Sequence, residues 1–304
     1  MIFHQAKPLS VAALVALTAC GGGGGGGDTG GGGGDPTPGS NGLPFGAVGQ
    51  TLLIDAVDRP ITMRSASFQA GSAPSIVPAT ITVDAGFFQG GTANLNGTIT
   101  IFGETVTIEN GQGTLDDSDE VVVVTFEPNR PSAENPAIYT AALEVNVSGQ
   151  GFNDVNGEAA YVFGFETEPD TIAARTGGTL TYVGDFQSFG SLGGANNAQT
   201  EYAGGITVAV NFAGSGNAIV TLDGQIGGTG NVDMAGNIGL TGNGFAGELN
   251  CTTGCTGAAS EVDATFYGPN ANELGGVLAI DITATDFGTY DGVGTFILTN
   301  PTAN

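Results

Sequence analysis

Short segments of alternating polarity most limit what this chain can fold into. In the second half, Ile206, Val208, Val210 and Phe212 alternate with small or polar residues. A period of two places such a set on one face of a β-strand. Gly, Asn and Asp separate the segments, and a helical period is nearly absent. We therefore predict an all-β fold.

Residues 176–304 divide into eight segments of this kind. They are Thr179–Asp185, Gly205–Phe212, Ala218–Leu222, Asn237–Thr241, Gly244–Asn250, Glu261–Tyr267, Gly275–Thr283 and Gly292–Leu298. Turn signals at this spacing indicate a sandwich or a barrel, and the many Gly inside the segments favour a small, strongly coiled barrel. Eight antiparallel strands can close and leave no exposed edge. We predict an eight-stranded antiparallel β-barrel for this domain.

Residues 42–175 are predicted to form a separate β-rich domain before the barrel. Its segments include Ala79–Val83, Gly97–Phe102, Val121–Phe126 and Ala142–Val147. The composition changes near Glu166–Gly178, and Pro169–Arg175 is expected to form one helical turn between the two domains.

The N-terminus has the features of a bacterial lipoprotein signal. An apolar run from Leu9 to Leu17 follows Lys7 and is too short to span a bilayer. It ends in Leu-Thr-Ala-Cys20, a lipobox-like sequence whose thiol could carry diacylglycerol. We predict a signal peptide at residues 1–19 and lipidation, including palmitate, at Cys20; the alternative is an ordinary secretory signal with a chance cysteine.

Residues 20–41 are dominated by Gly and are predicted to be a flexible tether, because Gly has no side chain to bury in a core. A lipid and a tether together would hold a folded domain off a membrane surface. Gly21, and not Asp, follows Cys20. By analogy with known sorting rules, we expect the outer membrane, with the chain exposed at the cell surface.

The charge balance excludes several kinds of chemistry. The chain has 5 Lys and Arg against 30 Asp and Glu, a formal net charge of -25. The only Lys and the only His are Lys7 and His4, both within the predicted signal peptide. A mature chain would therefore lack phosphate loops that end in Lys, histidine triads, Schiff-base lysines and histidine-bound metal or haem. Nucleic acid is not expected as a partner, because phosphate binding needs clustered cations.

Carboxylates are the catalytic option that remains. Glu166 with Glu168, or Asp281 with Asp286, could supply the acid and base of a glycosidase, but they share no motif beyond proximity. We therefore predict no enzymatic activity and no catalytic residues. Such a hydrolase is kept as a third hypothesis.

Two acidic stretches could be calcium loops. The acids at Asp116, Asp117, Asp119 and Glu120 lack EF-hand spacing, and we interpret them as charges that oppose aggregation of the neighbouring valine-rich strand. The stretch Gly227–Asp233 resembles a calcium-binding nonapeptide turn with its acid displaced, and we interpret it as a plain turn. No metal and no cofactor are predicted.

The cysteine count leaves one pair once Cys20 is lipidated. Cys251 and Cys255 are separated by Thr-Thr-Gly, which can turn tightly enough to bring the two sulfurs together. An even pair in an exported protein predicts a disulfide, here on a hairpin tip. The alternative is a redox pair, but such pairs normally have a two-residue spacer beside a helix.

Three stretches of the second half resemble one family. They are Phe266–Gly276, with Glu-x-Gly-Gly opening a strand, Gly242–Gly247, with Gly-Phe-x-Gly, and Thr179–Gly184. Together they are similar to the β-barrel domain of the transferrin-binding protein B-like surface lipoproteins of Gram-negative bacteria. The first half, including Phe163–Thr167, resembles the β-rich handle that precedes such barrels. The chain departs from the family at its end, Gly292–Leu298, and it holds one handle–barrel unit where the transferrin binders have two.

The resemblance implies a surface-displayed binding module for a host protein, an iron source or another solute. Transferrin binding itself is not carried over. An export modulator and an outer-membrane receptor are the expected partners. The loops in which we expect specificity are Phe186–Glu201, Asn250–Glu261 and Asp281–Asp291. Capture of haem through Tyr202 or Tyr267 is a further option, although a strand Tyr is more often packed. The alternative function is a structural envelope lipoprotein without a small-molecule ligand.

Overall fold

The computed structural model describes residues 61–69, 72–77, 79–83, 97–101, 104–114, 121–127, 140–148, 155–164, 166–193, 199–257 and 260–300. The predicted signal peptide, Cys20, the predicted tether and the acids from Asp116 to Glu120 lie outside these residues. Nearly every described element is a β-strand, so the prediction of an all-β fold is confirmed. Among the described residues, no helix has the length and apolar character needed to cross a membrane.

Nine strands of the first half pair into one antiparallel sheet, which we call the N-terminal sheet. They are β1 (Ile61–Gln69), β2 (Ser75–Ile76), β3 (Ala79–Val83), β4 (Gly97–Ile101), β5 (Glu104–Ile108), β6 (Gln112–Thr114), β7 (Val121–Glu127), β8 (Thr140–Ser148) and β9 (Val155–Gly164). Their order is β5-β4-β3-β1-β9-β8-β7-β6, and β2 pairs with β1. The four predicted segments correspond to β3, β4, β7 and β8.

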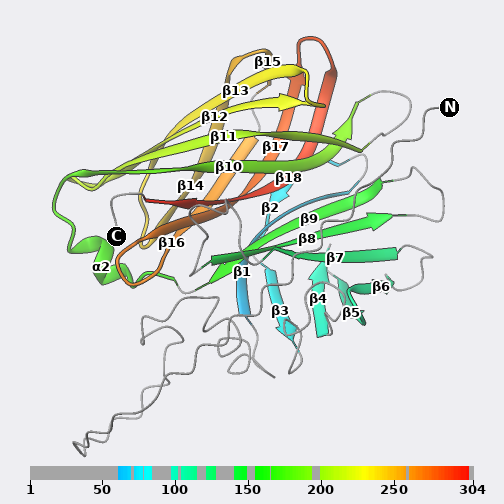
Figure 1. Ribbon diagram of the computed structural model, residues 1–304, viewed down its shortest axis with the longest axis horizontal. Helices are drawn as coiled ribbons and strands as arrows, with labels where there is room; N and C mark the ends of the chain where they lie inside the picture. Colours follow the sequence, from blue (N-terminus) through cyan, green and yellow to red (C-terminus); the bar gives the residue numbers. More distant parts are fainter. Residues whose placement is uncertain are drawn as a thin grey trace, which may run out of the picture. The chain divides into compact units, whose positions relative to one another are not determined.

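The second half forms the predicted barrel (Figure 1). Its strands are β10 (Thr179–Leu192), β11 (Gln199–Asn211), β12 (Asn217–Ile226), β13 (Gly230–Gly239), β14 (Gly244–Thr253), β16 (Ser260–Tyr267), β17 (Glu273–Ala284) and β18 (Gly288–Thr299). Because β18 pairs with both β10 and β17, the eight strands close. A short strand, β15 (Cys255–Thr256), adds to β17. The eight-stranded antiparallel barrel is therefore confirmed, with strands longer than the predicted segments.

The barrel interior is filled with side chains. Large aromatic residues, including Tyr182, Tyr202, Tyr290 and Phe296, are fully buried in one core cluster to which all eight strands contribute apolar side chains. The helix α2 (Pro169–Ala173), where the sequence predicted one helical turn, contributes Ile172 to the same cluster. The barrel is thus a packed core and not a channel.

Glycine allows neighbouring barrel strands to approach closely. A Cβ atom on Gly190 would lie 2.1 Å from the carbonyl oxygen of Asp291, and one on Gly204 would lie 2.1 Å from that of Asp223. Gly190 is paired with Gly292 and Gly204 with Gly224, so glycine faces glycine across two strand pairs. The expectation that glycines serve close backbone approach in a small barrel is met at these positions.

The N-terminal sheet covers one outer face of the barrel. Ala66, Ala142, Ala160 and Val162 of the sheet form a buried cluster with outward-facing residues of β16, β17 and β18. The barrel residues of this cluster are Tyr267, Val277, Ala279, Val293 and Ile297. Two apolar cores therefore lie on the two sides of these strands, one inside the barrel and one outside it.

Candidate binding site

Four turns of the barrel meet at one end, which we call the hairpin end. Backbone hydrogen bonds link them: Thr285 N donates to Gly254 O at 2.9 Å, and Gly227 N donates to Glu201 O at 2.9 Å. Gly193 N also donates to Thr289 O. The strand ends that flank the three predicted specificity loops lie here, whereas residues 194–198 and 258–259 of those loops are outside the described residues. The connection between β12 and β13 is a fourth turn at this end; it comprises residues 227–229, so the interpretation of Gly227–Asp233 as a turn holds for its first three residues, whereas residues 230–233 belong to β13.

The predicted loops are shorter than the sequence suggested. Phe186–Leu192 belongs to β10, residues 199–201 belong to β11, and β14 continues to Thr253. Similarly, β17 reaches Ala284 and β18 begins at Gly288. Only the tips of the predicted loops therefore connect strands, because the polar, glycine-rich ends of the strands still pair in register.

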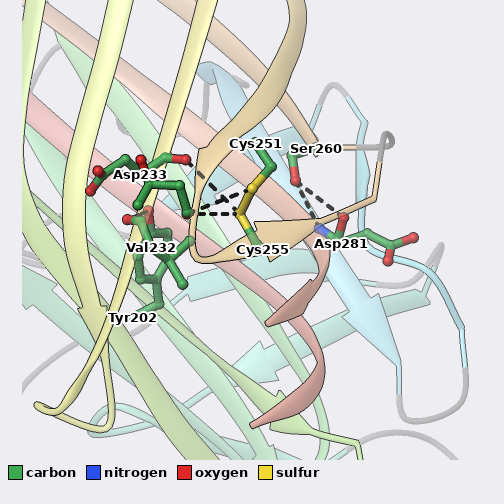
Figure 2. The surroundings of a disulfide bond; sticks show 8 residues. Tyr202, Val232, Asp233, Cys251, Cys255, Ser260 and Asp281 are labelled. Carbon is green, nitrogen blue, oxygen red and sulfur yellow. Dashed lines mark hydrogen bonds between the residues drawn. A yellow bond between two sulfur atoms is a disulfide. The ribbon is translucent and has the colours of Figure 1, made fainter. Parts of the chain in front are cut away.

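The predicted disulfide joins Cys251 and Cys255 at the hairpin end (Figure 2). The two Cα atoms are 5.7 Å apart. Gly254, between them, has a φ of +71° and would place a Cβ atom 2.0 Å from the Asn231 carbonyl oxygen, so glycine is required at this tip. Cys255 Sγ lies 3.9 Å from the Asp233 carbonyl oxygen. Because a disulfide sulfur has no proton, this is a packing contact that holds the tip against β13.

Carboxylates face carboxylates on the outside of the barrel. In the β-ladder, Asp223 lies directly opposite Asp233, Asp281 opposite Asp291, and Glu248 opposite Glu261. Like charges in directly opposed positions destabilise a sheet. Partial burial and the charge of Asp281 both raise the pKa of Asp291. The first two pairs lie toward the hairpin end, which is therefore strongly acidic.

Polar contacts fasten the N-terminal sheet to the barrel. The Arg64 guanidinium on β1 pairs with the Asp263 carboxylate and donates to Thr265 Oγ1, both on β16. Thr140 Oγ1 donates to Glu273 Oε2 at 2.8 Å, and this contact is buried. The sheet is thus joined to β16 and β17 by charge as well as by apolar packing.

A cavity of about 180 Å³ lies at the same junction. Residues of β8 and β9 line one side, and residues of β10, β11 and β18 line the other. Glu158 of β9 is 4% exposed and contributes its carboxyl group to the lining. The pKa of Glu158 is raised from 4.5 to about 8, mainly because burial desolvates the carboxylate; the neighbouring Glu144 charge also raises the pKa, and the hydrogen bonds from Gln199 and Asn146 lower it. No sequence motif marks Glu158, because its importance comes from the packing of two domains.

A second hollow, of about 290 Å³, lies beside α2 at the opposite end of the barrel. Arg175, Phe212 and Leu240 are among its lining residues. The Arg175 guanidinium lies over the Phe212 ring, 5.4 Å from its centroid, and Nη2 donates to the Asn270 carbonyl oxygen. The guanidinium therefore helps to hold α2 over this end of the barrel.

The catalytic and haem candidates are not assembled into a site. Tyr202 is buried inside the barrel and its hydroxyl donates to Val232 O at 2.9 Å (Figure 2). Tyr267 is buried against the N-terminal sheet. Burial raises the pKa of both phenols, so neither presents a phenolate to a ligand. Both tyrosines are therefore packed side chains, which is the alternative to haem capture given by the sequence.

The two carboxylate pairs weighed as glycosidase residues, Glu166 with Glu168 and Asp281 with Asp286, lie in different surroundings. Glu166 is exposed and accepts a hydrogen bond from Asn243 Nδ2, and Glu168 precedes α2. Asp281 faces Asp291 across the β17–β18 ladder, whereas Asp286 lies in the turn. Within the described part of the chain, no group of three or more His, Cys, Asp or Glu side chains is arranged to hold a metal ion.

One family model matches the barrel. Residues 170–296 match the family model described as the C-lobe and N-lobe beta barrels of Tf-binding protein B. The handle-plus-barrel resemblance drawn from the sequence is therefore supported over the barrel. No curated protein matches the chain.

Solved structures of transferrin-binding protein B are similar at low identity. The Trp-176-Ala mutant from Haemophilus parasuis Hp5 is 17% identical, with a TM-score of 0.44 over 78% of this chain and 45% of that one. The isotype 1 protein from serogroup B Neisseria meningitidis is 13% identical, with a TM-score of 0.43 over 79% of this chain and 43% of that one. The chain spans less than half the length of either structure.

Proposed function

We propose, from the premise that residues 170–296 form a barrel of the transferrin-binding protein B type, that the chain is a lipid-anchored binding protein of the bacterial surface. Cys20 would carry the lipid, residues 20–41 would act as the tether, and the outer membrane would be its location. The ligand would be a host protein, an iron source or another solute. Binding would be non-covalent, without enzymatic turnover.

The family match of the barrel is the observation that carries this proposal. The hairpin end supports it because four turns converge there on a rigid, closed scaffold. Such turns can vary in sequence without disturbing the strands, and binding residues are commonly placed on them. The disulfide fixes one of the tips and so lowers the entropy lost on binding.

The acidic pairs define the kind of partner that the hairpin end would recognise. Asp223 repels Asp233, and Asp281 repels Asp291, in the free protein. A basic surface on the partner would remove this repulsion and would also speed association at low salt. We therefore expect a partner with a cationic patch, bound more weakly as the salt concentration rises.

Anchoring and location are tested on intact cells. The mature protein should begin at Cys20 and carry the added mass of a diacylglycerol and an acyl chain, as measured by mass spectrometry. Protease added to intact cells should degrade the barrel if it faces outward. An unmodified N-terminus or complete protection from protease would reject the corresponding part of the proposal.

Binding is tested by pull-down with the full chain, with host transferrin among the candidates. The double variant Asp223→Asn/Asp233→Asn should retain less partner than the wild type. The matched control Glu168→Gln/Asp170→Asn removes two exposed charges at the opposite end of the barrel and should retain partner normally. Equal retention by both variants would remove the hairpin end from the proposal.

A structural envelope protein is the alternative function, and the covered barrel face gives it some support. The chain buries a large apolar surface between its own two sheets, which stabilises it without any ligand. A protein of this kind would be surface-exposed and lipidated but would show no saturable partner in the pull-down.

A further inference from the structure

The cavity at the domain junction has the dimensions of a small-molecule site. Its volume of about 180 Å³ is comparable with that of the roughly 150 Å³ cavity known to hold benzene in another protein. Phe189 and Val293 of the barrel and Ala159 and Ala160 of β9 supply apolar walls. Polar groups enter the lining from Glu144, Asn146, Glu158 and Gln199. Apolar walls with a few placed polar groups are typical of ligand sites.

Glu158 is held in a fixed position at this cavity. Asn146 Nδ2 on β8 and Gln199 Nε2 on β11 both donate to its Oε1 atom, at 3.4 and 2.5 Å. These donors come from both domains, so the carboxyl group is positioned by the junction itself. The side chain is 4% exposed, which means that it cannot turn away into solvent without a change in packing.

The lining around Glu158 is acidic. Glu144 on β8 adds a second carboxyl group at the cavity, and Tyr290 approaches from the barrel side. No Lys or Arg is among the residues that line this cavity in the described part of the chain. Burying an ionised carboxylate is costly, and a cation bound beside it offsets part of that cost.

We propose that this cavity binds a small organic cation, an ammonium ion with an apolar alkyl or aryl body, through the Glu158 carboxylate. The ammonium group would lie beside the Glu158 carboxyl group, and its apolar body would pack against Phe189 and Val293. This site shares Phe189 and Gln199 with the β10–β11 hairpin, but its central group, Glu158, lies on β9, and none of the four opposed aspartates of the hairpin end lines it.

The raised pKa of Glu158 predicts that binding of a cation releases a proton. The empty cavity holds Glu158 protonated up to about pH 8. A bound cation favours the carboxylate, so a proton must leave when the ammonium ion enters at neutral pH. Affinity should therefore rise from pH 6 to pH 8, and up to one proton should be released per bound ion.

Isothermal titration calorimetry of the full chain with benzylammonium tests the proposal. Titrations at pH 7 in two buffers of different ionisation enthalpy should show saturable binding and proton release. Benzyl alcohol, which has nearly the same shape but no charge, should bind at least about tenfold more weakly. Equal affinity for the two probes, or no saturable heat with benzylammonium up to tens of millimolar, would overturn the proposal.

A pair of variants distinguishes the cavity from the acidic surface. Glu158→Gln keeps an oxygen for the Asn146 and Gln199 donors but cannot become negative, and it should bind benzylammonium at least about tenfold more weakly, without proton release. Glu201→Gln removes an exposed carboxylate that contacts Gln187 and should bind like the wild type. Circular dichroism would verify that both variants are folded. Wild-type affinity in a folded Glu158→Gln variant would contradict the assignment.

Discussion

The outer surface of the barrel has two faces that differ in what covers them. On the open face, β12 alternates strictly between exposed and buried residues from Ala218 onward. On the face beneath the N-terminal sheet, the first eight residues of β17 are all buried, and most of β18 is buried as well. The barrel core is the same for both faces. The difference therefore arises from the cluster of Ala66, Ala142, Ala160 and Val162 that packs on β17 and β18.

This difference shows how the same kind of strand can be specified by two sequence patterns. A strand with one solvent-exposed face needs apolar residues only at alternate positions. A strand buried on both sides becomes a continuous apolar run, as in Val277–Ile280 and Phe296–Leu298. Apolar residues at the outward-facing positions of β17 and β18 therefore specify the covered face.

The largest predicted difference between the two faces is in the stability lost when a charged residue is introduced. Ile297 is fully buried beneath the N-terminal sheet, whereas Ile219 is 49% exposed on the open face. Ile297→Asp should lower the free energy of unfolding by about 4 kcal/mol or prevent folding, because it buries a charge and removes apolar contacts. Ile219→Asp should change it by less than about 0.5 kcal/mol. Urea unfolding followed by circular dichroism measures both, and similar losses would show that the two faces are not distinct in solution.

The covered face should also respond to pH through Glu158. Its pKa is raised from 4.5 to about 8 in the folded state, so the folded protein keeps a proton that the unfolded chain releases. Stability is therefore highest below about pH 4.5 with respect to this group, falls as the pH rises toward 8, and is then constant. By pH 7 the loss is of order 3 kcal/mol. Unfolding measured from pH 5 to pH 8 should show this decline in the wild type and a clearly smaller one in Glu158→Gln, since the neutral amide does not titrate.

The barrel could be predicted from the sequence because each strand and turn is specified by residues that are close together in the chain. Each of the eight strands contains its predicted segment in large part, and turns appear where Gly, Asn and Asp cluster. Strand ends were placed too early, as at Asp185, because the continuing Phe186–Leu192 stretch of β10 pairs through Gly and Ser that carry no strand signal. The Cys251–Cys255 disulfide was likewise predictable, from the short spacing and the even number of cysteines that remain beside Cys20.

The junction could not be predicted, because its residues are far apart in the chain. Glu158 and Gln199 are ordinary polar residues until the N-terminal sheet docks on the barrel. Arg64 similarly meets Asp263 across 199 positions of sequence. β1 and β9, which supply much of this contact, are not among the predicted segments, since β9 alternates little and contains Gly and Ala. The one sequence feature that indicates the junction is the continuous apolar runs of β17 and β18, which are typical of strands buried on both sides.

Two adjacent glycines on the open half should differ in their tolerance of a methyl group. A Cβ atom on Gly204 would lie 2.1 Å from the Asp223 carbonyl oxygen, while one on Gly205 would meet nothing within 4 Å. Gly204→Ala should therefore cost about 2 kcal/mol or more, because the β11 and β12 backbones must separate. Gly205→Ala should be neutral or slightly stabilising, by up to about 1 kcal/mol, since it restricts the unfolded chain. Thermal unfolding of the two variants measures the contrast, and a tolerated Gly204→Ala would mean that these strands are less closely spaced.

The smallest effect concerns the repulsion between opposed carboxylates on the open face. Asp223→Asn should stabilise the protein by a few tenths of a kcal/mol, because it relieves the direct opposition to Asp233. Asp185→Asn is the matched control, since Asp185 is exposed and lies opposite Gly205, so it changes the net charge equally without removing a direct pair. Chemical unfolding in low salt should reveal the difference between the variants, and about 1 M salt should abolish it because the screening length falls to about 3 Å. A difference that persists in high salt would indicate that packing or hydrogen bonding at Asp223, and not charge, distinguishes the two positions.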